Sequence, residues 1–216
     1  MPFVAFAARP RVASTEPLPV LLLLHEFFGL NDGICAKAQA FADELGCLCV
    51  APDLFRGTST TFIPQAIWLA LTTPQERVNT DLNAALRWAA EQPGVDATKV
   101  GVMGFCFGGG MSNALAVRLP NIIKAAAPFY GAQPSAEDTK MIKAKIQLHY
   151  AELDQRVNAG WPDYEKALKE NGVDYEAFIY SGTNHGFHND TTPRYDEDAA
   201  KLAWERTVAF FKKNLS

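Results

Sequence analysis

The sequence predicts a mostly parallel α/β fold, in which helices cover both faces of a central sheet. Its strongest apolar run, Val20–His25, is continuous rather than alternating, as expected for a strand that is covered on both faces. Segments with helical spacing separate this run from similar ones, and strands that alternate with helices form βαβ units with parallel strands. Hydrophobic residues make up 48% of the 216 residues and charged residues 20%, so the chain can bury a large core.

Short β-rich runs predict the strands of this sheet. Because helical segments lie between them, we expect most neighbouring strands to be parallel. In chain order the predicted strands are Phe3–Ala8, Val20–His25, Cys47–Ala51 (closed by Pro52), Lys99–Gly104, Ile123–Phe129, Lys145–Tyr150 and Tyr175–Tyr180.

Four of the intervening segments have the periodicity or the boundary residues of helices. A helical pattern through 82–89 ends before Pro93-Gly94, and a helix of small residues runs from Gly109 to about Arg118. A third runs from Trp161 to about Asn171, with Gly172 as a plausible C-cap. The last begins near Asp196 and places these residues on one face: Ala200, Ala203, Trp204, Thr207, Val208 and Phe211.

Residues 55–78 fit this alternation poorly. They contain a run of threonine and serine, two prolines and the apolar stretch Ala66–Leu71. Two interpretations have equal weight: a loop with a short helix that lies over the functional site, or a packed surface helix.

No repeat and no Gly/Ser-rich linker divides the chain, so we expect a single domain over residues 1–216.

Charge and composition exclude several classes of partner. The formal net charge is −4 and no basic run reaches five residues, so we expect no nucleic-acid partner. The apolar run Val20–Leu24 is far too short to span a bilayer, so we expect no membrane partner. Four cysteines in a chain of this length are not a disulfide framework and favour a reducing, cytoplasmic compartment: Cys35, Cys47, Cys49 and Cys106. The sequence leaves a monomer and a homodimer equally open.

The sharpest local motif is Gly104-Phe105-Cys106-Phe107-Gly108, which follows an apolar strand and opens a glycine-rich helix. A nucleophile elbow of the α/β-hydrolase type has this form. The tip residue of such a tight turn adopts strained backbone geometry, and glycines on either side avoid collisions. The turn presents Cys106 above the sheet, and the helix N-terminus stabilises an anion at its sulfur. The alternative is a buried cysteine at a glycine-rich helix start.

A cysteine nucleophile needs a base and a group that orients the base. In an α/β-hydrolase the chain order is nucleophile, acid, histidine. His185 and His188 both follow the last predicted strand. We expect His185 to be the base, and His188 to lie either at the surface or in contact with the catalytic residues without touching substrate. Asp154 follows the preceding strand and is the expected acid, although Glu152 competes with it.

The loop after the second predicted strand, His25 to Asn31, is the expected source of an oxyanion donor. The backbone N–H groups of Phe27 and Phe107 are the candidates. Glu26 would place a carboxylate beside the thiol, and a structural glutamate in an ion pair is the alternative interpretation.

Taken together, the chain resembles the dienelactone hydrolase family of α/β-hydrolases, over about residues 4–215. The motifs that carry the resemblance are His25-Glu26-Phe27-Phe28-Gly29-Leu30-Asn31, Ala51-Pro52-Asp53-Leu54, Gly104-Phe105-Cys106-Phe107-Gly108-Gly109, Phe129-Tyr130-Gly131 and His185-Gly186-Phe187-His188-Asn189-Asp190.

The resemblance implies the α/β-hydrolase fold and a catalytic triad of Cys106, Asp154 and His185; we expect no cofactor and no metal. It also implies that Glu26 holds the resting thiol and helps to release the thiolate when substrate arrives. Tyr130 would line the site, and Phe28 is expected beside it.

The chain departs from the family's archetype, which binds a substrate carboxylate with arginines. One such arginine follows the catalytic histidine by a few residues, where this chain has His188-Asn189-Asp190. The other belongs to the region that residues 55–78 replace, and Arg56 or Arg77 are the possible substitutes. We therefore expect Arg56 to contact substrate, and dienelactone itself is a doubtful substrate.

The leading functional hypothesis is a cysteine-dependent hydrolase of small activated esters or lactones, acting through a thioester. A second hypothesis is a catalytically idle α/β-hydrolase scaffold that binds a lactone-like ligand, because fold alone does not fix function. A metal hydrolase is a third, but the pair His185 and His188 lacks the carboxylate-rich partners of a metal site.

Overall fold

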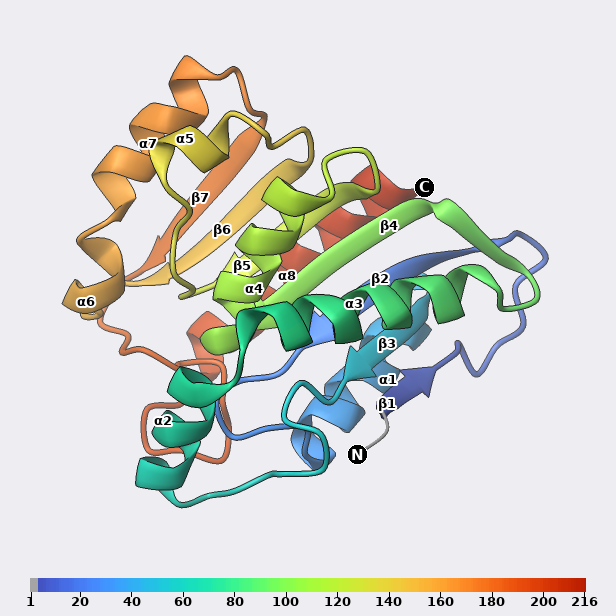
Figure 1. Ribbon diagram of the computed structural model, residues 1–216, viewed down its shortest axis with the longest axis horizontal. Helices are drawn as coiled ribbons and strands as arrows, with labels where there is room; N and C mark the ends of the chain where they lie inside the picture. The colour runs from blue at the N-terminus through green and yellow to red at the C-terminus, as the bar shows by residue number, and fades with distance from the viewer. Residues whose placement is uncertain (1–3) are drawn as a thin grey trace.

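The computed structural model describes residues 4–216 and contains a seven-stranded sheet in the order β1-β3-β2-β4-β5-β6-β7 (Figure 1). Only β1 is antiparallel to its neighbour, so the predicted mostly parallel sheet is confirmed. The strands are β1 (Ala5–Ala8), β2 (Leu18–Leu24), β3 (Leu48–Pro52), β4 (Val95–Phe105), β5 (Ile123–Phe129), β6 (Lys145–Ala151) and β7 (Tyr175–Tyr180). Phe3, predicted to begin the first strand, lies outside the described residues.

Helices cover both faces of the sheet, as the continuous apolar strands predict (Figure 1). Helices α1 (Asp32–Leu45) and α8 (Glu197–Leu215) pack on one face, whereas α3 (Gln75–Ala90), α4 (Phe107–Arg118) and α7 (Trp161–Glu170) pack on the other. Strand β2 shows why its sequence does not alternate: Leu22 and Leu24 enter one core, and Leu21 and Leu23 enter the other.

Helix α1 is absent from the predicted elements, although its sequence carries clear signals. The Asn31 side chain caps it by accepting a hydrogen bond from the Ile34 backbone N–H at 3.1 Å. Ile34, Ala38 and Phe41 recur at helical spacing and are buried, and Gly46 ends the helix in the left-handed conformation, with φ of +61°. Helix α8 begins as predicted, with Asp196 as its N-cap.

Residues 55–78 contain helix α2 (Ile63–Thr72) and the start of α3. Figure 1 shows α2 beyond the carboxyl end of the sheet, on the side where the loops after β6 and β7 also lie. The segment that precedes α2 contacts the loop after β2: the Thr60 backbone N–H donates a hydrogen bond to the Phe28 carbonyl at 3.0 Å. The short helices α5 (Ala136–Thr139) and α6 (Gln155–Asn158) complete the described elements. None of the helices in residues 4–216 combines the length and the apolar character needed to cross a bilayer.

Candidate active site

The turn between β4 and α4 has the geometry of a nucleophile elbow. Cys106 sits at its tip with φ of 55° and ψ of −111°, a conformation that L-residues rarely adopt. A Cβ on Gly108 would lie 2.2 Å from the Leu24 carbonyl oxygen, and one on Gly104 would lie 2.4 Å from the Gly108 carbonyl oxygen. Both glycines are therefore required by close backbone contacts, as the motif predicts.

Backbone hydrogen bonds fix the elbow to the neighbouring strands. The Cys106 N–H donates to the Phe129 carbonyl at 3.0 Å, and the Gly108 N–H donates to the His25 carbonyl at 3.1 Å. These bonds hold the sulfur at the carboxyl edge of the sheet, in front of the N-terminus of α4. That end of a helix carries partial positive charge and favours an anion.

The structure brings Cys106, His185 and Asp154 together in a hydrogen-bonded line. His185 Nε2 lies 3.0 Å from Cys106 Sγ, and His185 Nδ1 lies 2.5 Å from Asp154 Oδ2. The three residues lie far apart in sequence and follow β4, β7 and β6, so the parallel sheet brings them to the same edge. Asp154 also caps α6, because its Oδ1 accepts the Val157 backbone N–H at 3.3 Å.

The charges of this line support one another. Burial works against a positive charge on His185, but the hydrogen bonds to Asp154 and Cys106 outweigh it and raise the pKa of His185 to about 9. Burial also works against the Asp154 carboxylate, yet the hydrogen bond from His185 holds the pKa of Asp154 below its ordinary value. The geometry therefore favours a cationic His185 between two groups that can carry negative charge.

The two backbone N–H groups that the sequence proposes as oxyanion donors, those of Phe27 and Phe107, have no acceptor among the described residues. Phe107 follows the cysteine at the first position of α4, and Phe27 lies in the loop after β2 that the Gly108–His25 hydrogen bond ties to the elbow. These are the positions predicted for an oxyanion hole.

His25 holds this loop, a role that its position at a strand end did not reveal. Its Nε2 accepts the Leu54 backbone N–H at 3.0 Å, so Nδ1 carries the proton and donates to the Glu26 carbonyl at 2.6 Å. Burial lowers the pKa of His25, which keeps the ring neutral and preserves this tautomer. His25 is therefore a positioning residue for the Phe27 backbone.

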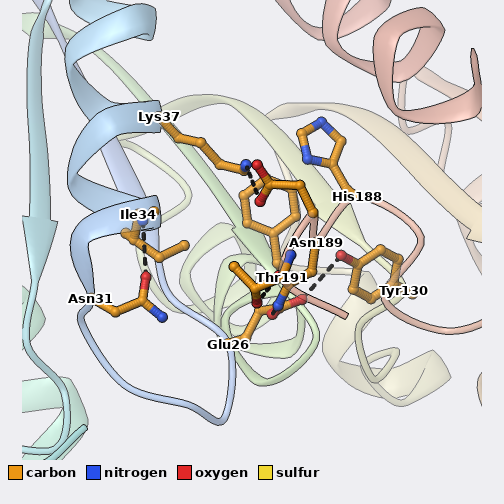
Figure 2. A pocket seen from close by; sticks show the side chains of 11 residues that line it. Glu26, Asn31, Ile34, Lys37, Tyr130, His188, Asn189 and Thr191 are labelled. Atoms are coloured by element: carbon orange, nitrogen blue, oxygen red, sulfur yellow. Dashed lines mark hydrogen bonds and ion pairs between the residues drawn. The ribbon is translucent and has the colours of Figure 1, made fainter. Parts of the chain in front are cut away.

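Glu26 is buried and accepts hydrogen bonds from two side chains. Its Oε1 accepts the Tyr130 hydroxyl at 3.1 Å, and its Oε2 accepts the Asn189 amide at 2.5 Å (Figure 2). Asn189 Oδ1 accepts both donors of Thr191, which fixes the amide so that its NH₂ group faces Glu26. In this arrangement the sulfur contacts His185 and the carboxylate of Glu26 contacts Tyr130 and Asn189.

Burial is the dominant influence on Glu26. It raises the pKa of the carboxyl group, and the hydrogen bonds from Asn189 and Tyr130 only partly oppose this. Glu26 also lines a cavity of about 30 Å³, enough for about one water molecule, which Figure 2 shows between the start of α1 and the loop after β7. Sequence reasoning gave no role to Asn189, although it follows His185 within the quoted motif.

The predicted substrate-binding residues have different environments. Tyr130 is buried, and its ring centroid lies 4.9 Å from that of His185. Phe28 is half-buried against Phe27, with ring centroids 4.3 Å apart. Arg56 forms a bidentate ion pair with buried Asp81, at 2.9 and 2.6 Å, so the carboxylate partner of its guanidinium is part of the protein.

The competing candidates lie elsewhere. Glu152 accepts hydrogen bonds from Ser181 Oγ and the Gly182 backbone N–H, so its carboxylate supports the turn after β7. His188 is buried rather than at the surface, and its ring packs against Phe105 at 4.9 Å between centroids. Burial lowers the pKa of His188 to about 3, so the ring is neutral.

Comparisons with known proteins bear on the family and the fold of the chain. Residues 3–215 match the family model described as "Dienelactone hydrolase family". "Protein usf" of Aquifex pyrophilus is 34% identical over 207 residues, covering 92% of this chain and 89% of its own length. The "Putative carboxymethylenebutenolidase" of Aquifex aeolicus is 33% identical over 209 residues, covering 91% of this chain and 89% of its own.

Solved structures show the same relationship. The crystal structure titled "Putative Dienelactone Hydrolase" from Klebsiella pneumoniae superposes with a TM-score of 0.83 at 26% identity, over 98% of this chain and 99% of that one. Sequence, fold and site geometry lead to one conclusion: the chain is an α/β-hydrolase that belongs to the dienelactone hydrolase family.

Proposed function

We propose that this protein, a hydrolase of carboxylic esters or lactones, uses Cys106 as its nucleophile and passes through a thioester. The observation that carries the proposal is the continuous line from Asp154 through His185 to the Cys106 sulfur, with contacts of 2.5 and 3.0 Å. An idle binding scaffold has no need for this alignment, which costs a strained backbone at Cys106 and a buried charge at Asp154.

In the first half of the reaction, the thiolate attacks the carbonyl carbon and a C–S bond forms. The carbonyl oxygen becomes an oxyanion, which the backbone N–H groups of Phe27 and Phe107 stabilise. When the adduct collapses, the C–O bond to the leaving group breaks and His185 transfers its proton to that oxygen. An alcohol or enol leaves from an ester; in a lactone it stays attached to the acyl chain.

In the second half, the neutral His185 takes a proton from water, and the hydroxide attacks the thioester carbon. The same two N–H groups hold the second oxyanion. Collapse breaks the C–S bond, returns Cys106 as a thiolate and leaves His185 protonated, while the product departs as a carboxylic acid. Asp154 stays ionised and fixes the tautomer and orientation of the His185 ring throughout.

The nucleophile limits the range of substrates. A thiolate leaves a tetrahedral adduct more readily than an ordinary alkoxide, so an unactivated ester returns to starting material. Enol lactones, aryl esters and thioesters, whose leaving groups are stabilised, are the substrates that this site favours. A reactive, partly exposed thiolate also needs protection from oxidation, which suits a cytoplasmic, reducing compartment.

The test is hydrolysis of p-nitrophenyl acetate by the wild type and by Cys106→Ala. We expect the alanine variant to lose activity by several orders of magnitude with unchanged circular dichroism, because the nucleophile is removed from an elbow rather than from the core. Cys35→Ala is the matched control, since Cys35 is also a free, partly exposed thiol. It should retain full activity.

Iodoacetamide gives a second readout. Alkylation should abolish activity in step with modification of the peptide that contains Cys106, as followed by mass spectrometry. An alanine variant with half the wild-type kcat, or full activity after complete alkylation of Cys106, would remove the nucleophile assignment. A wild type that does not hydrolyse p-nitrophenyl acetate at all would favour the binding-scaffold hypothesis.

A further inference from the structure

Helix α2 exposes large apolar side chains to solvent. Leu71 is 80% exposed, Phe62 65% and Trp68 62%, and about half of each of two isoleucines is also exposed. We refer to this surface as the α2 patch, which consists of Phe62, Ile63, Ile67, Trp68 and Leu71. Four of the five lie within a single helix of ten residues.

The opposite side of α2 is apolar as well. Ala66 and Leu69 are buried, and Leu69 belongs to the core beneath the helix. A helix that is apolar on all sides is ordinarily buried on all sides. No charged residue occurs between Arg56 and Glu76, so the patch has no charged rim within its own segment. The outer face of α2 therefore has the composition of an interface.

The charge distribution favours another protein surface over a bilayer. Helices that lie on membranes combine an apolar face with lysines and arginines that contact anionic lipids. Residues 57–75 contain neither, and the chain as a whole has a net charge of −4. Interfaces between identical subunits, in contrast, are the most apolar class and are depleted in charge at their centres.

The size of the patch fits one side of a small symmetric interface. Five large side chains, each exposed by about half or more, offer roughly 500 Å² on the scale of 150–250 Å² for one buried aromatic side chain. A stable interface needs about 800 Å² on each partner. The patch thus supplies more than half of it, and the uncharged flanks 57–61 and 72–75 can supply the polar rim.

We propose that two copies of this chain form a dimer by packing their α2 patches against each other. In a two-fold dimer the same patch faces itself, so a surface without charges meets no like-charge repulsion at the axis. Trp68 has the largest side chain of the patch and is the expected anchor of the interface. The dimer is independent of the catalytic proposal, because none of the patch residues belongs to the proposed triad or oxyanion hole.

The experiment measures mass in solution by sedimentation equilibrium over a range of micromolar concentrations. The wild type should approach twice the chain mass of 23.7 kDa. Trp68→Glu should shift the protein to the single-chain mass, because the dimer would bury two unpaired carboxylates. Trp88→Glu is the matched control: Trp88 is 42% exposed on α3, away from the patch, and this variant should remain a dimer.

Circular dichroism checks the fold of each variant. If Trp68→Glu fails to fold, Leu71→Ser provides the same test at the most exposed position of the patch. A wild type that stays at the single-chain mass at every concentration overturns the proposal, whether or not it binds lipid vesicles. A dimer that survives both patch substitutions, or that Trp88→Glu also dissociates, overturns it as well.

Discussion

Replacing Asp154 by asparagine would test the electrostatic basis of the site. The substitution preserves the shape of the side chain and removes the charge that faces His185 Nδ1 at 2.5 Å. Burial lowers the pKa of His185, and without the Asp154 charge less would counteract it. The pKa should therefore fall from about 9 toward the ordinary 6.5. Each pKa unit corresponds to ~1.4 kcal/mol, so a fall from about 9 to 6.5 would cost the imidazolium up to about 3.5 kcal/mol of stabilisation.

The expected kinetic effect follows from the same free energy. If the cationic His185 must donate a proton to the leaving group, kcat/KM should fall by roughly 300-fold, the factor equivalent to about 3.5 kcal/mol. NMR titration of the His185 ring measures the pKa, and p-nitrophenyl acetate hydrolysis measures kcat/KM. Glu152→Gln is the matched control, since Glu152 lies in the same loop but bonds to Ser181 and Gly182.

Stability gives an independent signature with a defined sign. The pKa of His185 is higher in the folded protein than the ordinary 6.5, so its charge stabilises the fold fully below about pH 6.5. This contribution is lost as the pH rises through about 9. The wild type should therefore exceed Asp154→Asn in unfolding free energy most clearly near pH 6, with a smaller difference above pH 9. A His185 that still titrates near 9 in the asparagine variant would refute the reasoning.

The remaining predictions concern the residues around this line. His185→Ala should abolish turnover, whereas His188→Ala should lower it mildly and mainly reduce the melting temperature, because His188 is packed in the core; the opposite ranking would reassign the base. Glu26→Gln should lower turnover yet make Cys106 react faster with iodoacetamide near neutral pH, because a neighbouring carboxylate disfavours the thiolate; equal or slower alkylation would limit Glu26 to positioning its neighbours. Gly108→Ala should yield little soluble protein or inactive protein, since its Cβ would lie 2.2 Å from the Leu24 carbonyl oxygen, and a fully active alanine variant would contradict the elbow geometry.

The two halves of the proposed site were predictable to different degrees. The elbow was visible because its requirements are local: a strand, two glycines beside a cysteine, and a helix start within a few residues. Chain order and their positions directly after predicted strands point to Asp154 and His185, and the structure places both in line with Cys106. The order is informative because successive strands of a parallel sheet end at the same edge.

The helices show the limits of local patterns. Helix α4 begins at Phe107, two residues before the predicted start at Gly109. The prediction was late because a run of small residues carries no signal for the first residue of a helix. Helix α1 was not predicted despite its Asn31 cap and its buried stripe. Within residues 55–78 the apolar stretch did form a helix, but only the structure reveals that most of its large side chains face solvent.

The sequence by itself determined the fold class, the family and the three residues of the hydrogen-bonded line. Neighbouring residues dictate continuous apolar strands and a glycine-flanked turn, and chain order along a parallel sheet points to Asp154 and His185. The tertiary structure decided which partners the buried charges have. Asp81 pairs with Arg56, and Asn189 binds Glu26, across separations that no periodicity encodes. A buried carboxylate is stable only with a hydrogen-bond donor beside it, and that donor can come from any part of the chain that packs nearby. Its partner therefore depends on the packed fold rather than on the local sequence.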